Sequence, residues 1–507
     1  MELEVSAFYQ FLFTTISFIV LSFISLYLLR SKLWCNCEIC NTYLTSSWSL
    51  KFHNLCDWYA HLLRESPTKT IHIHVLRNTI TANPENVRYM LKTNFENFPK
   101  GKPFSTILGD FLGQGIFNVD GHPWRFQRKM ASLELDKQSV RSYAFEIVNH
   151  EIEHRFIPLL SSSSEKKDVL DLQDVFKRFS FDSICKFSFG LDPMCLDLSL
   201  PLSEFAVSFD LASRLSAERA MTASPIVWKI KRMLNLGSEK QLKEAINMID
   251  VLAREVIVTK RQMGFATQKD LLSRFMRSVD DETYLRDIVI SFLLAGRDTV
   301  ASALTSFFWL MTTHKLVESA IRAEADKVLG PSVGLNSFEQ LQELHYLQAA
   351  IYESMRLYPP VQFDSKFCDQ DDVLPDGTFV KKGTRVTYHP YAMGRIEENW
   401  GPDCMEFKPE RWLKEGVFFT ENQFKYPVFQ PGLRVCLGKE MALMELKVVA
   451  LSLLRNFEIE TTAQFNVPRF SPGLTATFRG GLPVRCCQPI KGREMCSVTK
   501  MCLPRLI

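Results

Sequence analysis

One cysteine-containing segment constrains the fold of this chain more than any other feature: Phe429-Gln-Pro-Gly-Leu-Arg-Val-Cys-Leu-Gly438. Its cysteine, Cys436, stands just before a helical pattern, where the positive end of the helix dipole favours a thiolate over a thiol. Gly432 and Gly438 permit tight turns and the close backbone approach that a planar macrocycle needs. Arg434 could meet an anionic group. A buried loop cysteine is the alternative for a lone thiol, but the spacing F-x-x-G-x-R-x-C-x-G is specific.

This spacing resembles the heme-binding signature of the cytochrome P450 monooxygenases, and the chain resembles that family from about residue 50 to 490. The resemblance implies that Cys436 is the thiolate ligand of a heme b iron, where it would favour O–O cleavage. It also implies that the flanking loop residues contact the heme; these are Phe429, Gly432, Arg434 and Gly438. A monooxygenase of this kind consumes O2.

The source of electrons follows from what the sequence does not contain. No G-x-G-x-x-G motif follows a predicted strand, and no flavin domain is attached. By the resemblance, NADPH therefore delivers electrons through a separate membrane protein, NADPH–cytochrome P450 reductase. Nucleic acid is not an expected partner, because 60 Lys and Arg residues face 57 Asp and Glu residues and leave a net charge of only +3.

The segment Leu293-Leu-Ala-Gly-Arg-Asp-Thr-Val300 places two charges in an otherwise apolar helix, predicted from about Leu285 to His314. A buried charge needs a partner or a function, and a core helix with a satisfied ion pair is one explanation. The pattern A-G-x-D-T also resembles the oxygen-activation helix of the family. That resemblance implies that Asp298 and Thr299 relay protons and that Ala295 contacts the heme.

A second heme-binding pattern is Trp124-x-x-x-Arg128, whose two ends share one face of a predicted helix. Without the other motifs, an amphipathic surface helix would be the default interpretation. The resemblance implies that the indole and the guanidinium both bind heme propionate. His389, in the segment Tyr388-His-Pro-Tyr, is a further candidate for this region.

The pattern E-x-x-R places Glu353 and Arg356 one turn apart on a helix. Such a pair alone is usually a solvated salt bridge. Here the segment Phe407-Lys-Pro-Glu-Arg-Trp412 follows it, and in the resembling family an arginine such as Arg411 completes a triad. We expect these three residues to stabilise the core beside the heme and to take no part in the chemistry.

Several segments resemble the plant fatty-acid ω-hydroxylases, among them Leu108-Gly-Asp-Phe-Leu-Gly113 and Asp372-Val-Leu-Pro-Asp-Gly377. Ala295–Ala301 and a cysteine-rich stretch near the N-terminus resemble subfamily C of plant cytochrome P450 family 94. This implies terminal (ω) oxidation of an acyl carboxylate, with jasmonoyl-L-isoleucine converted to its 12-hydroxy and 12-carboxy forms in hormone catabolism.

Three alternatives remain open at this point. A general fatty-acid ω-hydroxylase of the cutin or suberin type is the nearest one. A heme-thiolate isomerase or dehydratase and a noncatalytic heme-binding membrane protein belong to other classes; an intact Asp298 and Thr299 argues against both.

An acyl carboxylate requires an apolar channel and a cationic or amide group at its far end. The sequence does not identify that group. The candidate channel residues, taken from an approximate alignment, are Phe104, Ile116, Phe117, Phe292, Ala295, Val361, Phe363 and Leu474.

The N-terminal run from Phe8 to Leu29 carries no charge and is long enough to span a bilayer, which takes about 20 helical residues. A cleavable signal peptide is the alternative, but its apolar core is usually only about 7–15 residues. Arg30 and Lys32 follow the run, so the remainder of the chain should face the cytosol. We expect a single-pass anchor in the endoplasmic reticulum membrane.

The fold class expected for the rest is mostly α with small β-sheets (α+β), as in the cytochrome P450 fold. We expect a membrane anchor over 8–30, a linker over 31–60, the heme-thiolate monooxygenase domain over 61–490 and a tail over 491–507. No linker rich in proline or glycine divides the large domain.

Two metal-like patterns are present but are not the preferred interpretation. Cys37-x2-Cys40, with His53 and Cys56 downstream, could hold zinc, and its position near the membrane could equally suit palmitoylation. His72-x-His74 shares one face of a predicted strand but lacks a third ligand.

Overall fold

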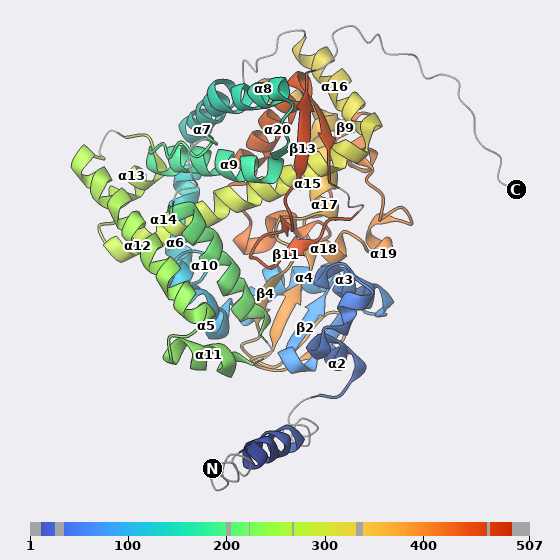
Figure 1. Ribbon diagram of the computed structural model, residues 1–507. Coiled ribbons are helices and arrows are strands. Elements are labelled where there is room, and N and C mark those ends of the chain that lie inside the picture. Colours follow the sequence, from blue (N-terminus) through green and yellow to red (C-terminus); the bar gives the residue numbers. More distant parts are fainter. Residues whose placement is uncertain are drawn as a thin grey trace, which may run out of the picture.

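Helices dominate the computed structural model, which describes residues 12–25, 35–198, 204–222, 224–265, 268–330, 338–463 and 467–488. The predicted fold class, mostly α with small sheets, is confirmed, and Figure 1 shows the long helices packed across one another around α15. The helices are α2 (Glu38–Thr45), α3 (Leu55–Glu65), α4 (Pro84–Arg88), α5 (Gly101–Leu112), α6 (Gly121–Leu135), α7 (Gln138–Glu151), α8 (Ile157–Lys166), α9 (Leu172–Phe189), α10 (Glu204–Met221), α11 (Pro225–Met233), α12 (Ser238–Met263), α13 (Leu271–Met276), α14 (Glu282–Leu293), α15 (Thr299–Thr313), α16 (Lys315–Leu329), α17 (His345–Leu357), α18 (Pro390–Met393), α19 (Glu397–Trp400) and α20 (Lys439–Asn456).

The strands are short and form small sheets. The largest sheet has the order β1-β2-β7-β4, in which β2 and β7 are parallel and the other pairs are antiparallel. It joins segments about 300 residues apart, because Asn78 of β2 lies opposite Arg385 of β7. The strands are β1 (Thr70–Ile73), β2 (Asn78–Thr81), β3 (Leu170–Asp171), β4 (Asp364–Phe367), β5 (Asp372–Val373), β6 (Phe379–Val380), β7 (Arg385–Tyr388), β8 (Leu413–Lys414), β9 (Val417–Phe418), β10 (Glu458–Thr461), β11 (Phe470–Ser471), β12 (Thr477–Phe478) and β13 (Pro483–Cys487).

One long helix runs through the centre of the molecule. It consists of α14, a π-helical turn at Leu294–Asp298 and α15, and it matches the helix predicted from Leu285 to His314. The π turn falls on the A-G-x-D-T pattern, where the Thr299 hydroxyl donates to the Ala295 carbonyl at 2.6 Å. A hydroxyl that bonds back in this way loosens the helix locally, and π turns of this kind often mark functional sites.

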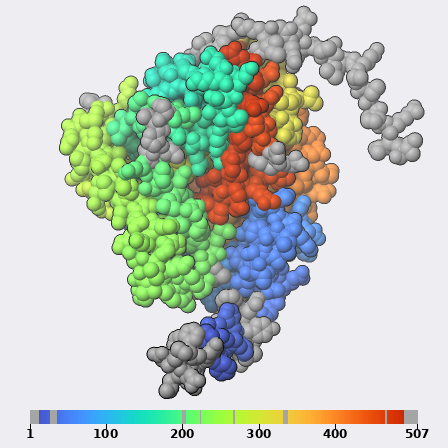
Figure 2. Space-filling view, viewed as in Figure 1, coloured from blue at the N-terminus to red at the C-terminus, as the bar shows by residue number. Residues whose placement is uncertain are grey.

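The apolar core divides into two clusters. The larger one joins α9, α15, α17 and α20, and the smaller one lies between α3 and the sheet that contains β2 and β7. Figure 2 shows the C-terminal segments in red lying between the helices of the middle of the chain in green and the N-terminal part in blue. The two ends of the large domain therefore contribute to one body.

The predicted anchor is described only from Leu12 to Ser25, which form an apolar helix. Residues 8–11 and 26–30 lie outside the described residues, as does the predicted tail over 491–507. Among the described residues, the helix that is long and apolar enough to cross a membrane is Glu282–Thr313, and 72% of its most apolar window is buried in the core. Length and composition alone therefore do not distinguish an anchor from this central helix.

The segment predicted as a linker is folded where it is described. Its residues form α2, a 3-10 turn at Ser47–Leu50 and the start of α3. Asn54 and Asp57 form a capping box at the start of α3, which fixes where that helix begins. Cys40 and Cys56 are buried in the smaller core cluster, so this segment packs against the sheet.

Candidate active site

The loop before α20 holds Cys436 in a defined turn. The Cys436 amide donates to the Phe429 carbonyl at 2.9 Å, and the Val435 amide donates to Gly432 at 3.2 Å. Gly432 has φ of 82°, and a Cβ at this position would overlap the carbonyl oxygen of Leu91. Only glycine satisfies both conditions, as the sequence pattern predicts.

The Cys436 side chain is exposed although its loop lies against the core. Burial of the surrounding loop raises the pKa of the Cys436 thiol, while the Gly438 amide, Arg128 and Lys439 act in the opposite direction. The backbone amide at the start of α20 therefore lowers the pKa of the thiol, as predicted, but burial raises this pKa by more. A metal cation at the sulfur would favour the thiolate.

Open space adjoins the sulfur. A Cβ added to Gly438 would have the Cys436 sulfur, at 4.0 Å, as its nearest neighbour. On the central helix Ala295 is exposed and Thr299 is half-buried, whereas Arg297, Asp298 and Val300 beside them are buried. An exposed alanine in the middle of a core helix indicates an interior space and not the outer surface.

Arg434 does not reach into this space as a free cation. It donates to Asp120 at 2.7 Å and to the Val119 carbonyl at 2.9 Å, and its guanidinium lies 4.4 Å from the centre of the Trp124 ring. Trp124, predicted to contact the heme, is thus next to Arg434. Arg128 lies close enough to Cys436 for each to raise or lower the pKa of the other.

Sequence reasoning missed a buried charge cluster beside Arg434. Lys100 and Lys366 contact the two carboxylate oxygens of Asp364, at 2.5 Å and 2.7 Å, and Gln430 donates to Asp364 at 3.0 Å. Asp120 in turn accepts the amides of Lys100 and Gly101. No local motif could have revealed this cluster, because its members come from segments far apart in the chain.

The charges of this region do not balance. Lys100, Lys366, Arg434 and Arg128 are four cations, while Asp120 and Asp364 are two carboxylates. Burial lowers the pKa of Lys366 strongly, although Asp364 opposes it. The region keeps a surplus of positive charge, which suits a ligand that carries carboxylates, and with a nearby soft thiol this donor set fits heme b.

The two candidate proton-relay residues lie in different environments. Asp298 accepts from Arg297 at 3.1 Å, and Arg297 also pairs with Asp210 of α10, which Lys177 of α9 approaches at 3.3 Å. Burial raises the pKa of Asp298, while Arg297 opposes the shift. The satisfied ion pair considered from the sequence is therefore present.

The Thr299 hydroxyl has a different role. Its hydrogen is used in the bond to the Ala295 carbonyl, so its oxygen is left to accept.

The predicted triad is assembled around Glu353, which is fully buried with Arg356. Arg356 donates to both oxygens of Glu353, at 2.7 Å and 2.8 Å, and Arg411 donates at 3.3 Å. The Trp412 indole is a fourth member that the motif did not indicate; it donates to Glu353 at 2.9 Å. Further donations from Arg356 to loop carbonyls tie the α17 helix to the segment before the cysteine loop.

None of the eight predicted channel residues is fully buried, and four of them, Phe104, Phe292, Phe363 and Leu474, pack against the edges of the two core clusters. The other four are Ile116, Phe117, Ala295 and Val361. Phe363 lies at a pocket between α10, α3 and the β2–β7 pair, whose lining also includes Tyr43, Tyr59, Arg385 and His389. His389 is fully buried and caps α18 by accepting from the Ala392 amide, so no described contact joins it to the charge cluster.

Arg385 is the cation of this pocket. Its guanidinium donates to the Ser365 hydroxyl at 2.8 Å and to the Ala220 carbonyl at 3.0 Å, both neutral acceptors. Burial lowers the pKa of Arg385, and Tyr59, Tyr43 and Asp364 oppose the shift. Within the described part of the chain, no carboxylate lies within ion-pair distance of Arg385. Sequence reasoning missed this residue because a single arginine in a strand carries no signal.

The comparisons with known proteins agree with this geometry. The family model described as Cytochrome P450 matches residues 42–478. Cytochrome P450 94C1 of Arabidopsis thaliana is 60% identical over 93% of this chain and 98% of its own length. Cytochrome P450 94B1 of Arabidopsis thaliana is 49% identical over 88% of each chain, and cytochrome P450 94A1 of Vicia sativa is 43% identical over 86% of this chain and 87% of its own.

The fold has a solved counterpart. The crystal structure of the cytochrome P450DA heme domain has a TM-score of 0.68 and covers 81% of this chain and 88% of that chain, at 20% identity. The identities, the family match and the fold agree, and membership brings heme-thiolate iron, O2 and reductase-supplied NADPH as the cofactors. The chain therefore belongs to the cytochrome P450 monooxygenases, in family 94 and, by its 60% identity to the 94C1 protein, with subfamily C.

Proposed function

We propose that this monooxygenase oxidises the terminal carbon of an acyl carboxylate and that jasmonoyl-L-isoleucine is its main substrate, converted to the 12-hydroxy and then the 12-carboxy form. The observation that carries the proposal is Arg385, a half-buried cation whose hydrogen-bond partners are neutral. Keeping such a charge without a carboxylate is costly, and a substrate carboxylate would complete the pair.

The position of Arg385 supports a substrate role. It shares its pocket with Phe363, a predicted channel residue, and the remaining lining is largely apolar, with Ile80, Leu76 and Met221 among it. In this proposal the substrate carboxylate would pair with Arg385 and the acyl chain would lie along this apolar lining. The far end of the chain then points away from Arg385, which restricts oxidation to the terminal carbon.

In this proposal Cys436 is the thiolate ligand of the heme, and Trp124 and Ala295 contact the macrocycle. Arg128, Arg434, Lys100 and Lys366 neutralise its two carboxylates. When bound, the heme supplies the two-electron activation of O2 that places one oxygen atom in a C–H bond and releases the other as water.

The chain's own residues handle protons. Thr299 keeps its hydroxyl oxygen available as an acceptor, because its hydrogen is directed to the Ala295 carbonyl. Asp298 is held by Arg297, and burial raises its carboxyl pKa, so it exchanges a proton more readily than an exposed aspartate does. Together they form the proposed route by which protons enter the site.

We also propose how the enzyme is placed in the cell. The apolar helix that includes Leu12–Ser25 would anchor it in the endoplasmic reticulum membrane over 8–30, with the 61–490 domain in the cytosol and 491–507 as a tail. NADPH–cytochrome P450 reductase in the same membrane would be its electron donor.

The test is a microsomal assay with the reductase that compares jasmonoyl-L-isoleucine and its 12-alcohol with laurate and oleate. We expect oxygen at the chain terminus and the highest kcat/KM with the hormone conjugate. Oxygen placed away from the terminus would contradict ω-oxidation, and a preference for laurate or oleate would favour the general fatty-acid hydroxylase. Turnover without NADPH would favour an isomerase or dehydratase, and no NADPH oxidation with any acyl substrate would favour a noncatalytic protein.

Arg385→Gln isolates the anchor. Loss of one charge-assisted hydrogen-bonded pair should raise KM by about 10- to 100-fold, from about 1.5–3 kcal/mol, with a much smaller change in kcat. Lys381→Gln, which changes an exposed cation four residues before Arg385, is the control and should leave KM unchanged. An unchanged KM in Arg385→Gln would show that Arg385 does not bind the substrate carboxylate. The position of oxidation would still be decided by the product analysis.

A further inference from the structure

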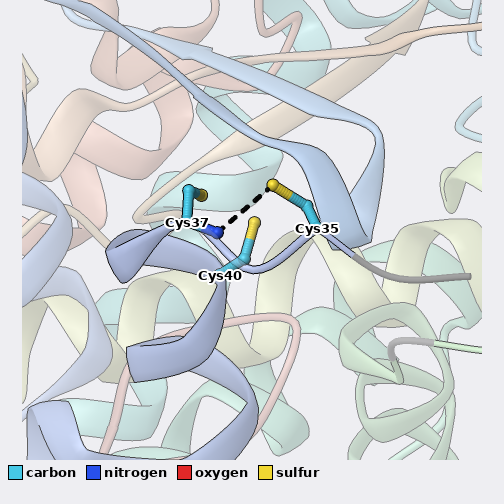
Figure 3. A group of neighbouring side chains, drawn as sticks. All are labelled: Cys35, Cys37 and Cys40. Atoms are coloured by element: carbon cyan, nitrogen blue, oxygen red, sulfur yellow. Dashed lines mark hydrogen bonds between the residues drawn. The ribbon is translucent and has the colours of Figure 1, made fainter. Parts of the chain in front are cut away.

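Three cysteines near the N-terminal end of the folded body converge on one point. The sulfurs of Cys35, Cys37 and Cys40 all lie within 4.8 Å of one another, and Figure 3 shows the side chains directed toward a common centre. Among the described residues, this is the one group of three or more His, Cys, Asp or Glu side chains whose ligand atoms lie this close together. None of the three is in a disulfide.

Local structure holds the three sulfurs in place. Cys37 caps the start of α2, and Cys40 lies in its first turn with no exposed surface. The Cys37 amide donates to the Cys35 sulfur at 3.5 Å, which folds the preceding residue back onto the helix start. Cys40 belongs to the smaller core cluster, so the cluster is anchored to the sheet and is not on a loose tail.

The arrangement differs from the zinc pattern considered from the sequence. That pattern paired Cys37 and Cys40 with His53 and Cys56. Cys56 instead donates to the Gln362 side chain at 3.3 Å, and Cys35 supplies the third sulfur. The set is therefore Cys-x-Cys-x2-Cys, with all three ligands from one short segment.

The spacing fits a single metal ion. Three thiolates that each lie about 2.3 Å from one ion are about 4 Å from one another. The observed sulfur–sulfur distances are at most 4.8 Å, so small side-chain rotations would bring the three sulfurs to that spacing. Thiolates select soft d10 ions such as Cu(I) and Zn²⁺. Three ligands complete a trigonal Cu(I) shell, whereas Zn²⁺ would need a fourth ligand.

We propose that Cys35, Cys37 and Cys40 form a three-thiolate site for a thiophilic d10 cation, with Cu(I) as the best fit. Each metal–sulfur bond forms as a thiol proton leaves, so three protons are released per ion. Burial raises the pKa of the Cys40 thiol to about 11. For Cys37, burial acts in the same upward direction, but the amides of Cys40 and Ile39 and the other two sulfurs lower its pKa overall.

The site shares no residue with the Cys436 loop or with the proposed substrate pocket, although α2 also contributes Tyr43 to that pocket. An ion bound there would join the residues just before α2 to the core and so fix the start of that helix. It would not alter the chemistry at Cys436.

The test uses the full-length holoenzyme, reduced and handled without oxygen. Cu(I) is titrated against a chromophoric chelator of known affinity, with Zn²⁺ as a second probe, and bound metal and thiolate-to-metal absorption are measured. We expect about one Cu(I) per chain, retained by Cys487→Ser and lost by at least tenfold in affinity in Cys35→Ser and Cys37→Ser. Cys487 is the matched control because it is also an accessible free cysteine.

The heme spectrum checks that each variant is folded. We expect folded variants because neither Cys35 nor Cys37 is fully buried. Equal metal binding in all variants would overturn the proposal, and so would the absence of bound metal in the wild type with both probes. Alkylation provides a second measure: the metal should protect Cys37 in the wild type, and unchanged alkylation would also overturn it. One equivalent of Zn²⁺ that is lost in the same variants would support the three-thiolate site.

Discussion

Glu353→Gln offers the most direct test of how the heme-side core is held together. Glu353 accepts five hydrogen bonds, from Arg356 twice and from Lys408, Arg411 and Trp412 once each. Glutamine has nearly the same shape but only one accepting oxygen. Its amide nitrogen would face two donors that it cannot satisfy, and the charge that balances the fully buried Arg356 would be lost.

The expected cost follows from these contacts. Breaking a buried ion pair by removing one partner costs about 3–5 kcal/mol, because the remaining charge is left uncompensated. That corresponds to about a 10²- to 10⁴-fold change in the unfolding equilibrium. Whole proteins are stable by only about 5–15 kcal/mol, so much of the margin would be lost.

The assay is urea unfolding of the full-length holoenzyme, followed by the Soret band of the reduced, carbon-monoxide-treated form. We expect a lower midpoint and a smaller yield of heme-loaded protein. The control is Glu410→Gln, an exposed glutamate that accepts one bond from the Tyr346 hydroxyl and should shift the midpoint little. A wild-type midpoint in Glu353→Gln would refute the view that the triad stabilises this core.

Three further predictions concern protons, pH and backbone. Thr299→Ala should keep heme binding but divert NADPH into peroxide and water, measured as the ratio of product to NADPH consumed; an unchanged ratio would remove Thr299 from proton delivery. Burial lowers the pKa of His389 to about 3 from 6.5, so the unfolded chain binds the extra proton first and stability falls as pH drops from 6.5. His389→Asn should therefore lose less stability than the wild type, by up to about 1.4 kcal/mol per pH unit, in urea midpoints taken between pH 6.5 and 4.5. Gly432→Ala should lose heme-loaded protein because its Cβ would overlap Leu91, whereas Gly480→Ala, with a similar positive φ and open surroundings, measures the backbone cost alone.

Sequence reasoning could fix local geometry where the residues are close together in the chain. The Cys436 loop, the Trp124–Arg128 pair and the Glu353–Arg356 pair are each defined within one turn or one helix, so spacing alone fixes their geometry. The long central helix was also predictable, because its apolar pattern is continuous. These parts are the ones that we propose lie around the heme.

Contacts between distant segments could not be predicted in the same way. Arg297 of the central helix forms an ion pair with Asp210 of α10, and Asp364 forms one with Lys100, more than 260 residues earlier in the chain. The sequence marks Arg297 as a charge in an apolar helix but does not reveal its partner, and the other residues look like ordinary surface charges. Only the fold shows which of these residues pair.

The two cationic regions differ in a way that assigns them to different ligands. The cluster around Arg434 already contains Asp120 and Asp364, so it keeps part of its charge balanced before any ligand arrives and needs a dianion to complete it. Arg385 has only neutral partners among the described residues and a single charge to satisfy, which suits a monocarboxylate that enters and leaves. A permanent dianionic cofactor and a transient monoanionic substrate are the ligands that match these two balances. If Arg385→Gln impaired heme loading instead of KM, this division of the interior charges would be wrong.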